Sequence, residues 1–369
     1  MTTDVARAPC TNYEPPDLRA LLSVFLSVLL SALGGAQRLP RGCGQGSPAG
    51  ARCIFCASRF KSFKFEFTNK KRDSILQETA HEELSLPKIW LRAFTPEWIY
   101  VLRKCLIDFR LGHGAFPNLL RPRSFSEKIQ YRKLFDHRYA LVQFADKFAV
   151  RDYVRQRLGD DVLPKLYHLT EDPDDIPLVR LPGRFVVKPT HGSGWIEVVH
   201  DKTLIDLDRL EARCAYWLHT NFFYTAGEWA YSRVTPRLMF EELLEDSEGG
   251  VPNDLKFFVF GGRVEFISVD IDRFGDHRRN MYDRAWNRLD FGFQRAGSDR
   301  PMPPPSRLEE MIRDAEILAG DFDFLRIDLY QCGERIVFGE ITATPASGLE
   351  PFWPGGTDRW IGELWKMKR

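Results

Sequence analysis

Residues 324–345 read FLRIDLYQCGERIVFGEITATP, and this stretch decides the fold that we expect for the chain. Two short runs, 325–330 and 335–341, are rich in branched and apolar residues. They flank Cys332, Gly333 and Glu334, a combination that is typical of an antiparallel hairpin. The sequence therefore predicts two paired strands near the end of the chain.

The pairing of these strands brings four chemically active side chains together. A turn centred on Glu334 places Asp328 opposite Glu340 and Arg326 opposite Thr342. Because side chains alternate faces along a strand, all four would share one face. Neighbouring carboxylates repel each other unless a cation lies between them, and Mg²⁺, which usually binds together with phosphates, suits such a pair. The alternative is a surface hairpin whose charges are solvated.

Length and composition limit the classes of protein. The chain has 369 residues, 44% of them hydrophobic and 28% charged, as expected for a soluble globular protein of one large or two smaller domains. A formal net charge of +1 argues against a nucleic-acid partner bound chiefly through charge. The cysteines of the body, Cys105, Cys214 and Cys332, are widely separated, which favours free thiols in a reducing compartment.

Residues 1–88 differ in character from the rest and are expected to be a poorly ordered extension. Within them, residues 20–36 read ALLSVFLSVLLSALGGA, an apolar run at the short end of what spans a bilayer. A signal peptide, a membrane anchor and an amphipathic surface helix all remain open. We draw no functional conclusion from this extension.

The order of expected elements predicts an α+β body. A helical part, 89–160, precedes a body, 161–369, in which strands and helices mix. Ser124 to Glu127 form a capping box at the start of one helix. The expected helices are 95–112, 125–135, 139–158, 207–220 and 306–319. The expected strands, besides the hairpin, are 185–188, 195–200, 238–244, 254–260 and 263–272.

Residues 185–195, FVVKPTHGSGW, have the pattern of a phosphate-binding loop. Lys188 ends an apolar strand, and Gly192, Ser193 and Gly194 follow in a loop of small residues. Glycines let backbone N–H groups approach phosphate oxygens, and the ammonium adds a point charge. The alternative is a glycine-rich hairpin turn.

Three further charged groups could belong to the same site. Glu241 and Glu242 end an apolar strand, where a carboxylate could accept a hydrogen bond from an adenine amino group. Asp254 and Lys256 share one face of a strand. Arg273 and the run 277–280 could clamp an anionic substrate. For each group the alternative is ordinary: a strand that becomes a solvated loop, a weak ion pair, or a solvated run of charge.

The order of these motifs resembles that of the ATP-grasp superfamily, and most closely its TupA-like branch, which is associated with teichuronopeptide and other cell-surface polysaccharide synthesis. The resemblance extends from about residue 94 to the end of the chain. It rests on six motifs in order: SFSEKIQYRKLFDHR, ADKFAVRDYV, FVVKPTHGSG, EELLED, DLKFFVFGGRVEFISVDIDRF and LRIDLYQCGERIVFGEITATPASGLEPF. It implies an α+β fold in which two subdomains hold the nucleotide, with ATP and Mg²⁺ as cofactors.

The resemblance also implies a role for each candidate residue. Lys147 and Lys188 would contact phosphates beside the flexible loop of Gly192, Ser193 and Gly194, and Glu241 and Glu242 would face the adenine and ribose. Asp328 and Glu340 would hold Mg²⁺, Arg326 would neutralise the transferring phosphoryl group, and Lys256 and Arg273 would assist. Thr342 stands where many ATP-grasp enzymes have Asn. A hydroxyl is a weaker ligand than an amide carbonyl, although the TupA-like branch tends to Thr here.

The implied activity is an ATP-dependent ligation. Mg-ATP would phosphorylate a small-molecule or polymer-end carboxylate, and an amine would attack the acyl phosphate to give an amide, ADP and phosphate. The need for ATP predicts a cytoplasmic site, with residues 20–36 as a candidate tether to the inner face of the membrane. Two alternatives are a kinase or sugar-modifying enzyme on the same fold, and a non-catalytic scaffold in polysaccharide assembly.

Overall fold

The computed structural model describes residues 97–246, 249–273, 275–300 and 302–368. The expected extension 1–88, with its apolar run 20–36, lies outside the described residues, as does the expected boundary near 88. By its contacts the chain divides into two units, Met1–Thr68 and Asn69–Arg369, and every described residue belongs to the second. Within the described part, no helix has both the length and the apolar character that a membrane crossing requires.

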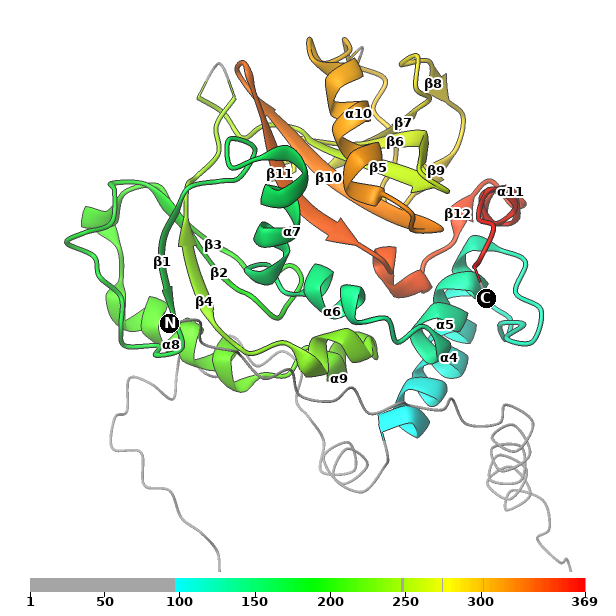
Figure 1. Cartoon of the computed structure of the whole chain (residues 1–369), viewed down its shortest axis with the longest axis horizontal. Coiled ribbons are helices and arrows are strands. Elements are labelled where there is room, and N and C mark those ends of the chain that lie inside the picture. Colours follow the sequence, from blue (N-terminus) through cyan, green and yellow to red (C-terminus); the bar gives the residue numbers. More distant parts are fainter. Residues whose placement is uncertain (1–96, 247–248, 274, 301, 369) are drawn as a thin grey trace, which may run out of the picture. The chain divides into compact units, whose positions relative to one another are not determined.

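A six-stranded antiparallel sheet forms the centre of the described unit (Figure 1). It contains both hairpins that the sequence predicts, joined through the pairing of β10 with β5. The sheet continues through β7, which the sequence analysis did not predict as a strand. In spatial order its strands are β11 (Arg335–Thr342), β10 (Phe324–Cys332), β5 (Asp254–Phe260), β6 (Arg263–Ile271), β7 (Arg278–Tyr282) and β8 (Arg288–Leu289).

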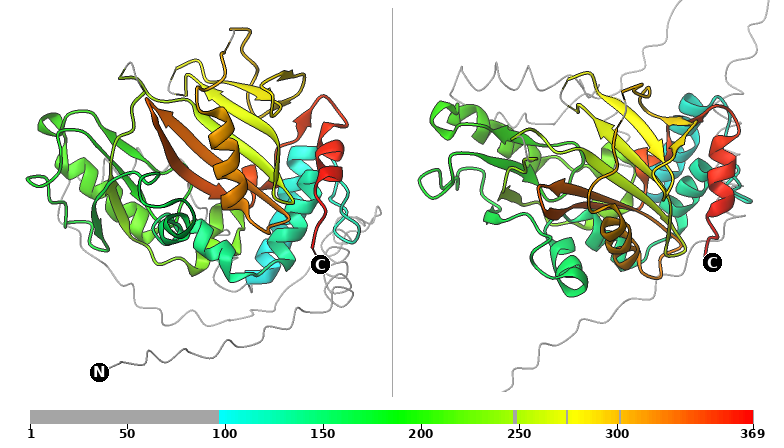
Figure 2. Two further views of the ribbon diagram at one scale, coloured as in Figure 1. Left: turned by 45° about the horizontal axis from the view of Figure 1, so that its top comes forward. Right: turned by 90° about the horizontal axis from the view of Figure 1, so that it is seen from above.

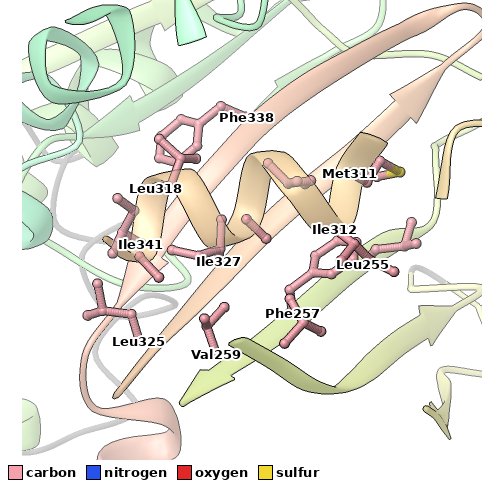
Figure 3. Packing of buried hydrophobic residues seen from close by; sticks show 14 of the residues in the cluster. Leu255, Phe257, Val259, Met311, Ile312, Leu318, Leu325, Ile327, Phe338 and Ile341 are labelled. Carbon is pink, nitrogen blue, oxygen red and sulfur yellow. The ribbon is translucent and has the colours of Figure 1, made fainter. Parts of the chain in front are cut away.

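The two faces of this sheet have different partners. One face packs against α10 (Leu308–Ala319), whose Met311, Ile312 and Leu318 lie against apolar side chains from β5, β10 and β11 (Figure 3). The opposite face is divided. At one end it joins a phenylalanine cluster with α5 and α11, and at the other end its strands present charged side chains. The fold thus leaves one charged region on an otherwise apolar sheet.

The pairing of β10 with β11 agrees with the sequence-based register at the four residues of interest. Asp328 lies opposite Glu340, and Arg326 lies opposite Thr342. The turn is tighter than expected, because Cys332 already pairs with Arg335. A bulge at Gly339 then adds one residue to β11 and restores the register.

A second antiparallel sheet has the order β1 (Leu166–Thr170), β4 (Leu238–Glu241), β2 (Phe185–Pro189), β3 (Glu197–Val199). Its apolar side chains pack with those of α8 (Leu207–His219) in a core of their own. The expected strand 238–244 is too long: β4 ends at Glu241, after which Glu242 turns to bond the backbone of Lys165.

The helices that precede the sheets depart from the sequence analysis at one point. The expected single helix 139–158 is wrong, since α6 (Tyr139–Ala145) and α7 (Ala149–Leu158) are separate. The Asp146 carboxylate accepts hydrogen bonds from the backbone N–H groups of Phe148 and Ala149, 2.8 and 3.1 Å away. This local capping competes with the helix, as aspartate commonly does.

The other helices agree with the sequence more closely. Helix α5 (Phe125–Phe135) has the predicted capping box of Ser124 and Glu127, and α4 (Glu97–His113) precedes it. Helix α11 (Thr357–Leu364), which was not expected from the sequence, packs beside α5 (Figure 2). The remaining short elements are η1 (Lys202–Leu204), α9 (Phe223–Ala226), η2 (Trp229–Arg233), β9 (Gly292–Phe293), η3 (Pro345–Gly348) and β12 (Phe352–Trp353). The α+β class is confirmed.

Candidate active site

A cleft of about 230 Å³ collects residues from distant parts of the sequence. Lys147, from the break between α6 and α7, and Ser193, from the loop after β2, line it together with residues of η2, β11 and η3. Five of the residues singled out in the sequence line this cleft: Lys147, Ser193, Arg326, Glu340 and Thr342. We refer to it below as the cleft.

Arg326 holds the two acids of the hairpin. Its Nε and Nη2 donate to the two carboxylate oxygens of Asp328, each at 2.7 Å, and Nη2 also donates to Glu340. Thr342 Oγ1 donates to Glu340 Oε1 at 2.8 Å. Burial lowers the pKa of Arg326, but Asp328 and Glu340 outweigh burial and raise it. The predicted quartet of side chains therefore forms one hydrogen-bonded group.

A charge cluster extends from this group along the sheet, away from the cleft lining. Lys256 donates to Asp254 and, at 2.9 Å, to Asp328 Oδ2, while Arg273 Nη1 donates to Asp254 at 3.0 Å. Burial raises the pKa of Asp328 to about 6 against the attraction of Arg326 and Lys256. Arg326 lines the cleft, whereas Asp328, Lys256 and Arg273 do not.

The same cluster includes part of the basic run 277–280. The run is divided, because the Arg278 side chain is 40% exposed and pairs with Asp276, whereas Arg279 is buried. Its expected role as a clamp on an anionic substrate stays a prediction. Arg279 is buried in β7, where its guanidinium donates to both oxygens of Asp270, at 2.5 and 2.9 Å. The alternation of β7 turns this side chain onto the charged face of the sheet, opposite Asp270.

Of the two lysines expected at the phosphates, Lys147 lines the cleft and Lys188 does not. The backbone N–H of Lys147 donates to Thr190 O at 3.0 Å, and its ammonium donates to Gly192 O. Lys188 forms an ion pair with Glu241. Burial lowers the pKa of Lys147 to about 8, and among nearby charges Glu340 raises it and Lys188 lowers it. Lys147 is therefore within electrostatic reach of both the hairpin acid and the second lysine.

The loop after β2 has the features of an anion-binding turn. A Cβ on Gly192 would lie 2.4 Å from the Trp195 ring, and Gly194 has a φ of +74°, so both positions favour glycine. In the described part of the chain, no hydrogen bond uses the backbone N–H groups of Gly192, Ser193 or Gly194. These donors are available to an anion such as a phosphate.

Glu242 is not part of the cleft. It pairs with Arg335, at 2.8 Å, and accepts from the backbone N–H of Lys165 at 3.0 Å. Its neighbour Glu241 is buried, and besides Lys188 it lies 4.0 Å from Arg151. The expected roles of the two acids toward adenine and ribose stay predictions.

The cleft also contains polar residues that the sequence analysis missed. Lys133 from α5, Glu228 and Tyr231 around η2, and Thr344 and Ser347 after β11 all line it. In the sequence, Lys133 follows the helical pattern of a surface residue, and GEWAY at 227–231 belongs to no predicted element. The small polar residues of ITATPAS, which directly follow Glu340, were the one available signal.

The residues present fit Mg-ATP. Among the described residues no group of three or more His, Cys, Asp or Glu side chains could hold a metal by itself. Mg²⁺ is commonly bound by one or two carboxylates together with nucleotide phosphates. The Glu340 side chain is 36% exposed beside Asp328, and Lys147 and Ser193 line the same cleft, with Lys188 within electrostatic reach of Lys147. This donor set suits a magnesium–phosphate complex better than a bare ion.

Several solved structures resemble the described fold at low identity. The ATP-grasp ligase PsnB complexed with a minimal precursor matches with 14% identity over 62% of this chain and 61% of that chain, at a TM-score of 0.34. D-alanine–D-alanine ligase from Bacillus anthracis matches with 15% identity over 54% and 56%, at 0.31. Macrocyclase MdnC bound with precursor peptide MdnA, from Microcystis aeruginosa MRC, matches with 14% identity over 62% and 63%, at 0.33. The chain spans about three fifths of PsnB, and TM-scores this low carry no argument about its function.

The family assignment is firmer. No curated protein matches the chain. The model of the family described as TupA-like ATPgrasp, in contrast, matches residues 127–366, nearly two thirds of the chain. ATP and Mg²⁺ are the cofactors of ATP-grasp enzymes, so the cofactors expected from the sequence are those of the matched family. Together with the α+β fold and the cleft, this match shows that the chain belongs to the TupA-like ATP-grasp family.

Proposed function

We propose that the protein is an ATP- and Mg²⁺-dependent ligase that joins a carboxylate to an amine through an acyl phosphate. The observation that carries this proposal is the composition of the cleft. Lys147 and Ser193 line it together with Arg326, Glu340 and Thr342. Groups suited to phosphate thus share one small space with Glu340, an acid suited to Mg²⁺, as phosphoryl transfer requires.

The lysines and the glycine loop act on the nucleotide in this proposal. Lys147 and Lys188 provide two positive charges beside the free N–H groups of residues 192–194. We assign these groups to the phosphates, where fixed donors lower the energy of the developing charge without reorganisation. When Lys188 binds phosphate, Glu241 remains beside it to fix the direction of the ammonium.

The hairpin acts on the transferred group. We assign Asp328 and Glu340 as magnesium ligands, with Thr342 orienting Glu340 through its hydrogen bond. The bound Mg²⁺ would neutralise charge on the phosphates. Arg326 would balance charge on the transferring phosphoryl group, and Lys256 and Arg273, next to Asp254, would keep the carboxylates of the cluster ionised and in place.

The proposed reaction balances as two displacements. A carboxylate oxygen of the acid attacks the γ-phosphorus and ADP leaves. The amine nitrogen then attacks the acyl carbon, phosphate leaves, and the nitrogen loses one proton. The chain's own residues orient these groups and exclude water from the acyl phosphate. No nucleophilic side chain is required.

We further propose that the substrates are small molecules or polymer ends in cell-surface polysaccharide or peptide-polymer synthesis, and that the reaction occurs in the cytoplasm. The family assignment and the need for ATP support this part of the proposal. A tether through residues 20–36 to the inner face of the membrane is its furthest extension. Fractionation of cells, with and without residues 1–88, tests it.

An assay of ADP and phosphate release tests the activity. The full chain is incubated with Mg-ATP and with pairs of acids and amines, uronic acids and amino acids among them. Release that needs both an acid and an amine supports the ligase. A phosphorylated sugar would instead indicate a kinase, and the absence of nucleotide binding would leave only a scaffold. Asp328→Asn should abolish turnover, whereas Glu309→Gln, an exposed acid on α10, should not.

A further inference from the structure

Two charged side chains at one end of the cleft, Lys133 and Glu228, make no direct ion pair in the described part of the chain. Lys133 is 2% exposed, and its ammonium donates to Ser347 Oγ at 2.8 Å. Glu228 accepts a hydrogen bond from Thr344 Oγ1 at 2.6 Å. Among the described residues, neither charge lies within 4.0 Å of an opposite charge, although both line the cleft. Burial raises the pKa of Glu228 and outweighs the more distant charge of Lys133 and the hydroxyls, which act to lower it.

Burying these two charges without direct ion pairs costs free energy in the protein without a ligand. Removing a charge from water is unfavourable unless an opposite charge or several hydrogen bonds compensate. Most other buried charges around the cleft are paired, Arg326 with Asp328 and Lys188 with Glu241 among them. Lys133 and Glu228 differ because their compensation is incomplete. A ligand that brings a negative and a positive group would complete it.

The backbone that surrounds these two charges is held in an unusual conformation. Ala346 and Ser347 have φ of 48° and 54°, in the left-handed region that non-glycine residues rarely adopt. Gln130 Nε2 holds the loop by donating to Ser347 O and Gly348 O, at 2.8 and 3.0 Å. Ser347 Oγ in turn donates to Ala226 O at 3.1 Å. Strained residues fixed by their surroundings are a common feature of binding sites.

The same end of the cleft lies close to the reacting groups. Tyr231 lines the cleft. Burial raises the pKa of its hydroxyl well above the ordinary value, and the negative charges of Glu228 and Glu340 raise it further. The Tyr231 hydroxyl is thus within electrostatic reach of both Glu228 and the hairpin acid. A ligand bound at Lys133 and Glu228 would therefore lie beside Arg326 and Glu340.

Resting on the proposed function, we propose that Lys133 and Glu228 form the subsite for the amine substrate, and that this substrate is an amino acid. Glu228 binds its ammonium group and accepts one proton from it before the nitrogen attacks, and Lys133 binds its carboxylate. Thr344 and Ser347 fix the two charged side chains in position through their hydroxyls. An amine without an acid group satisfies only one of the two charges, and an acid without an amine satisfies only the other.

The test compares zwitterions with ligands that lack one charge. Isothermal titration calorimetry of the full chain with Mg-AMPPNP bound is run with the common L-amino acids, D-alanine and D-glutamate. The amino acid that binds best is then compared with its decarboxylated amine and its N-acetyl derivative. Loss of either charge should weaken binding roughly tenfold or more, the effect of removing one charge-assisted interaction.

Two variants test which residue binds the ammonium group of the amino acid and which binds its carboxylate. Glu228→Gln, which keeps the hydrogen bond from Thr344, should weaken binding of the amino acid roughly tenfold and leave binding of the N-acetyl derivative unchanged. Lys133→Met should weaken binding of the amino acid and leave binding of the decarboxylated amine unchanged. Glu309→Gln, on the exposed side of α10, should change neither. The Glu228 variant and the ligand comparison suffice if the Lys133 variant does not fold.

The outcomes separate this inference from the proposed function. If Mg-AMPPNP binds but no amino acid does, or if the decarboxylated amine binds as tightly as the amino acid, the subsite is wrong and the ligase proposal stands. If Glu228→Gln binds the amino acid normally, the assignment of Glu228 is wrong. If the unmodified chain does not bind Mg-AMPPNP, the proposed function itself is refuted, and the inference with it.

Discussion

Replacing Arg326 by Met should destabilise the protein more than any replacement of an exposed arginine. The guanidinium makes three charge-assisted hydrogen bonds, two to Asp328 and one to Glu340, and its side chain is 10% exposed. Met has a similar volume, so the change removes the charge and leaves little empty space. The two acids would then face each other with only Lys256 to compensate Asp328.

The size of the effect follows from these contacts. Breaking a buried ion pair by removing one partner costs about 3–5 kcal/mol, because the remaining charge stays buried. Lys256 still pairs with Asp328, so we expect the lower end, about 3 kcal/mol. With an m-value of about 3 kcal/mol/M for a unit of this size, the urea midpoint should fall by about 1 M.

Urea unfolding followed by tryptophan fluorescence measures the change, and the chain provides a matched control. Arg335, on the same hairpin, pairs with Glu242 at 2.8 Å, but its side chain is 47% exposed. Arg335→Met should cost less than about 1 kcal/mol, as exposed pairs do. If the two variants unfold at the same urea concentration, the guanidinium of Arg326 does not hold the two acids together as the structure indicates.

Added Mg²⁺ gives the same variant a second readout. With the guanidinium gone, the two carboxylates should bind Mg²⁺ more readily in the absence of nucleotide. Saturation at about 100 times the dissociation constant would return about 2.7 kcal/mol of stability. A midpoint of Arg326→Met that is insensitive to Mg²⁺ would argue against Asp328 and Glu340 as the magnesium ligands.

Three more outcomes are expected. The pKa of Lys147 is about 8 in the free protein and must rise when phosphates bind. Mg-AMPPNP binding at pH 8 should therefore take up about half a proton, measured by calorimetry in two buffers, and the affinity should fall as the pH rises through 8. Lys147→Met should remove this proton uptake. Lys188→Met should weaken Mg-AMPPNP binding roughly tenfold or more while circular dichroism stays unchanged, and normal binding would exclude its phosphate role. Gly339→Val should lower the free energy of unfolding by about 1–3 kcal/mol, since a Cβ there lies 2.8 Å from the Tyr330 ring, whereas Gly355→Ala, with open space around it, should be neutral in the same urea experiment.

The hairpin acids were predictable because strands repeat every two residues. Arg326 and Asp328, two apart on one strand, must share a face, and pairing brings Glu340 and Thr342 beside them. The glycine-rich loop was predictable for a similar reason, since small residues after an apolar strand limit the backbone to a few turns. Local pattern and chemistry sufficed in both places.

Several side chains could not be placed from local pattern because contacts with distant segments decide where they lie. Lys133 occupies a helical position that normally faces solvent, and only the packing of α5 against η3 buries it. Arg279 is similar, because its burial depends on Asp270 from a neighbouring strand. Asp146 ends a helix that periodicity alone would continue. In each case a contact between distant segments outweighs the local preference.

The single extra residue at Gly339 has a consequence for comparing this protein with its relatives. If the same sequence paired without the bulge, Glu340 would lie opposite Ile327, on the side of the sheet that α10 covers. A strand that lacks the extra residue would instead place its acid opposite Asp328 one position earlier in the sequence. A relative whose strand is one residue shorter would therefore need a gap at this position before its acid could be matched with Glu340. An alignment that forbids gaps within strands would compare an apolar residue with Glu340, the proposed magnesium ligand, and would classify an active enzyme as inactive.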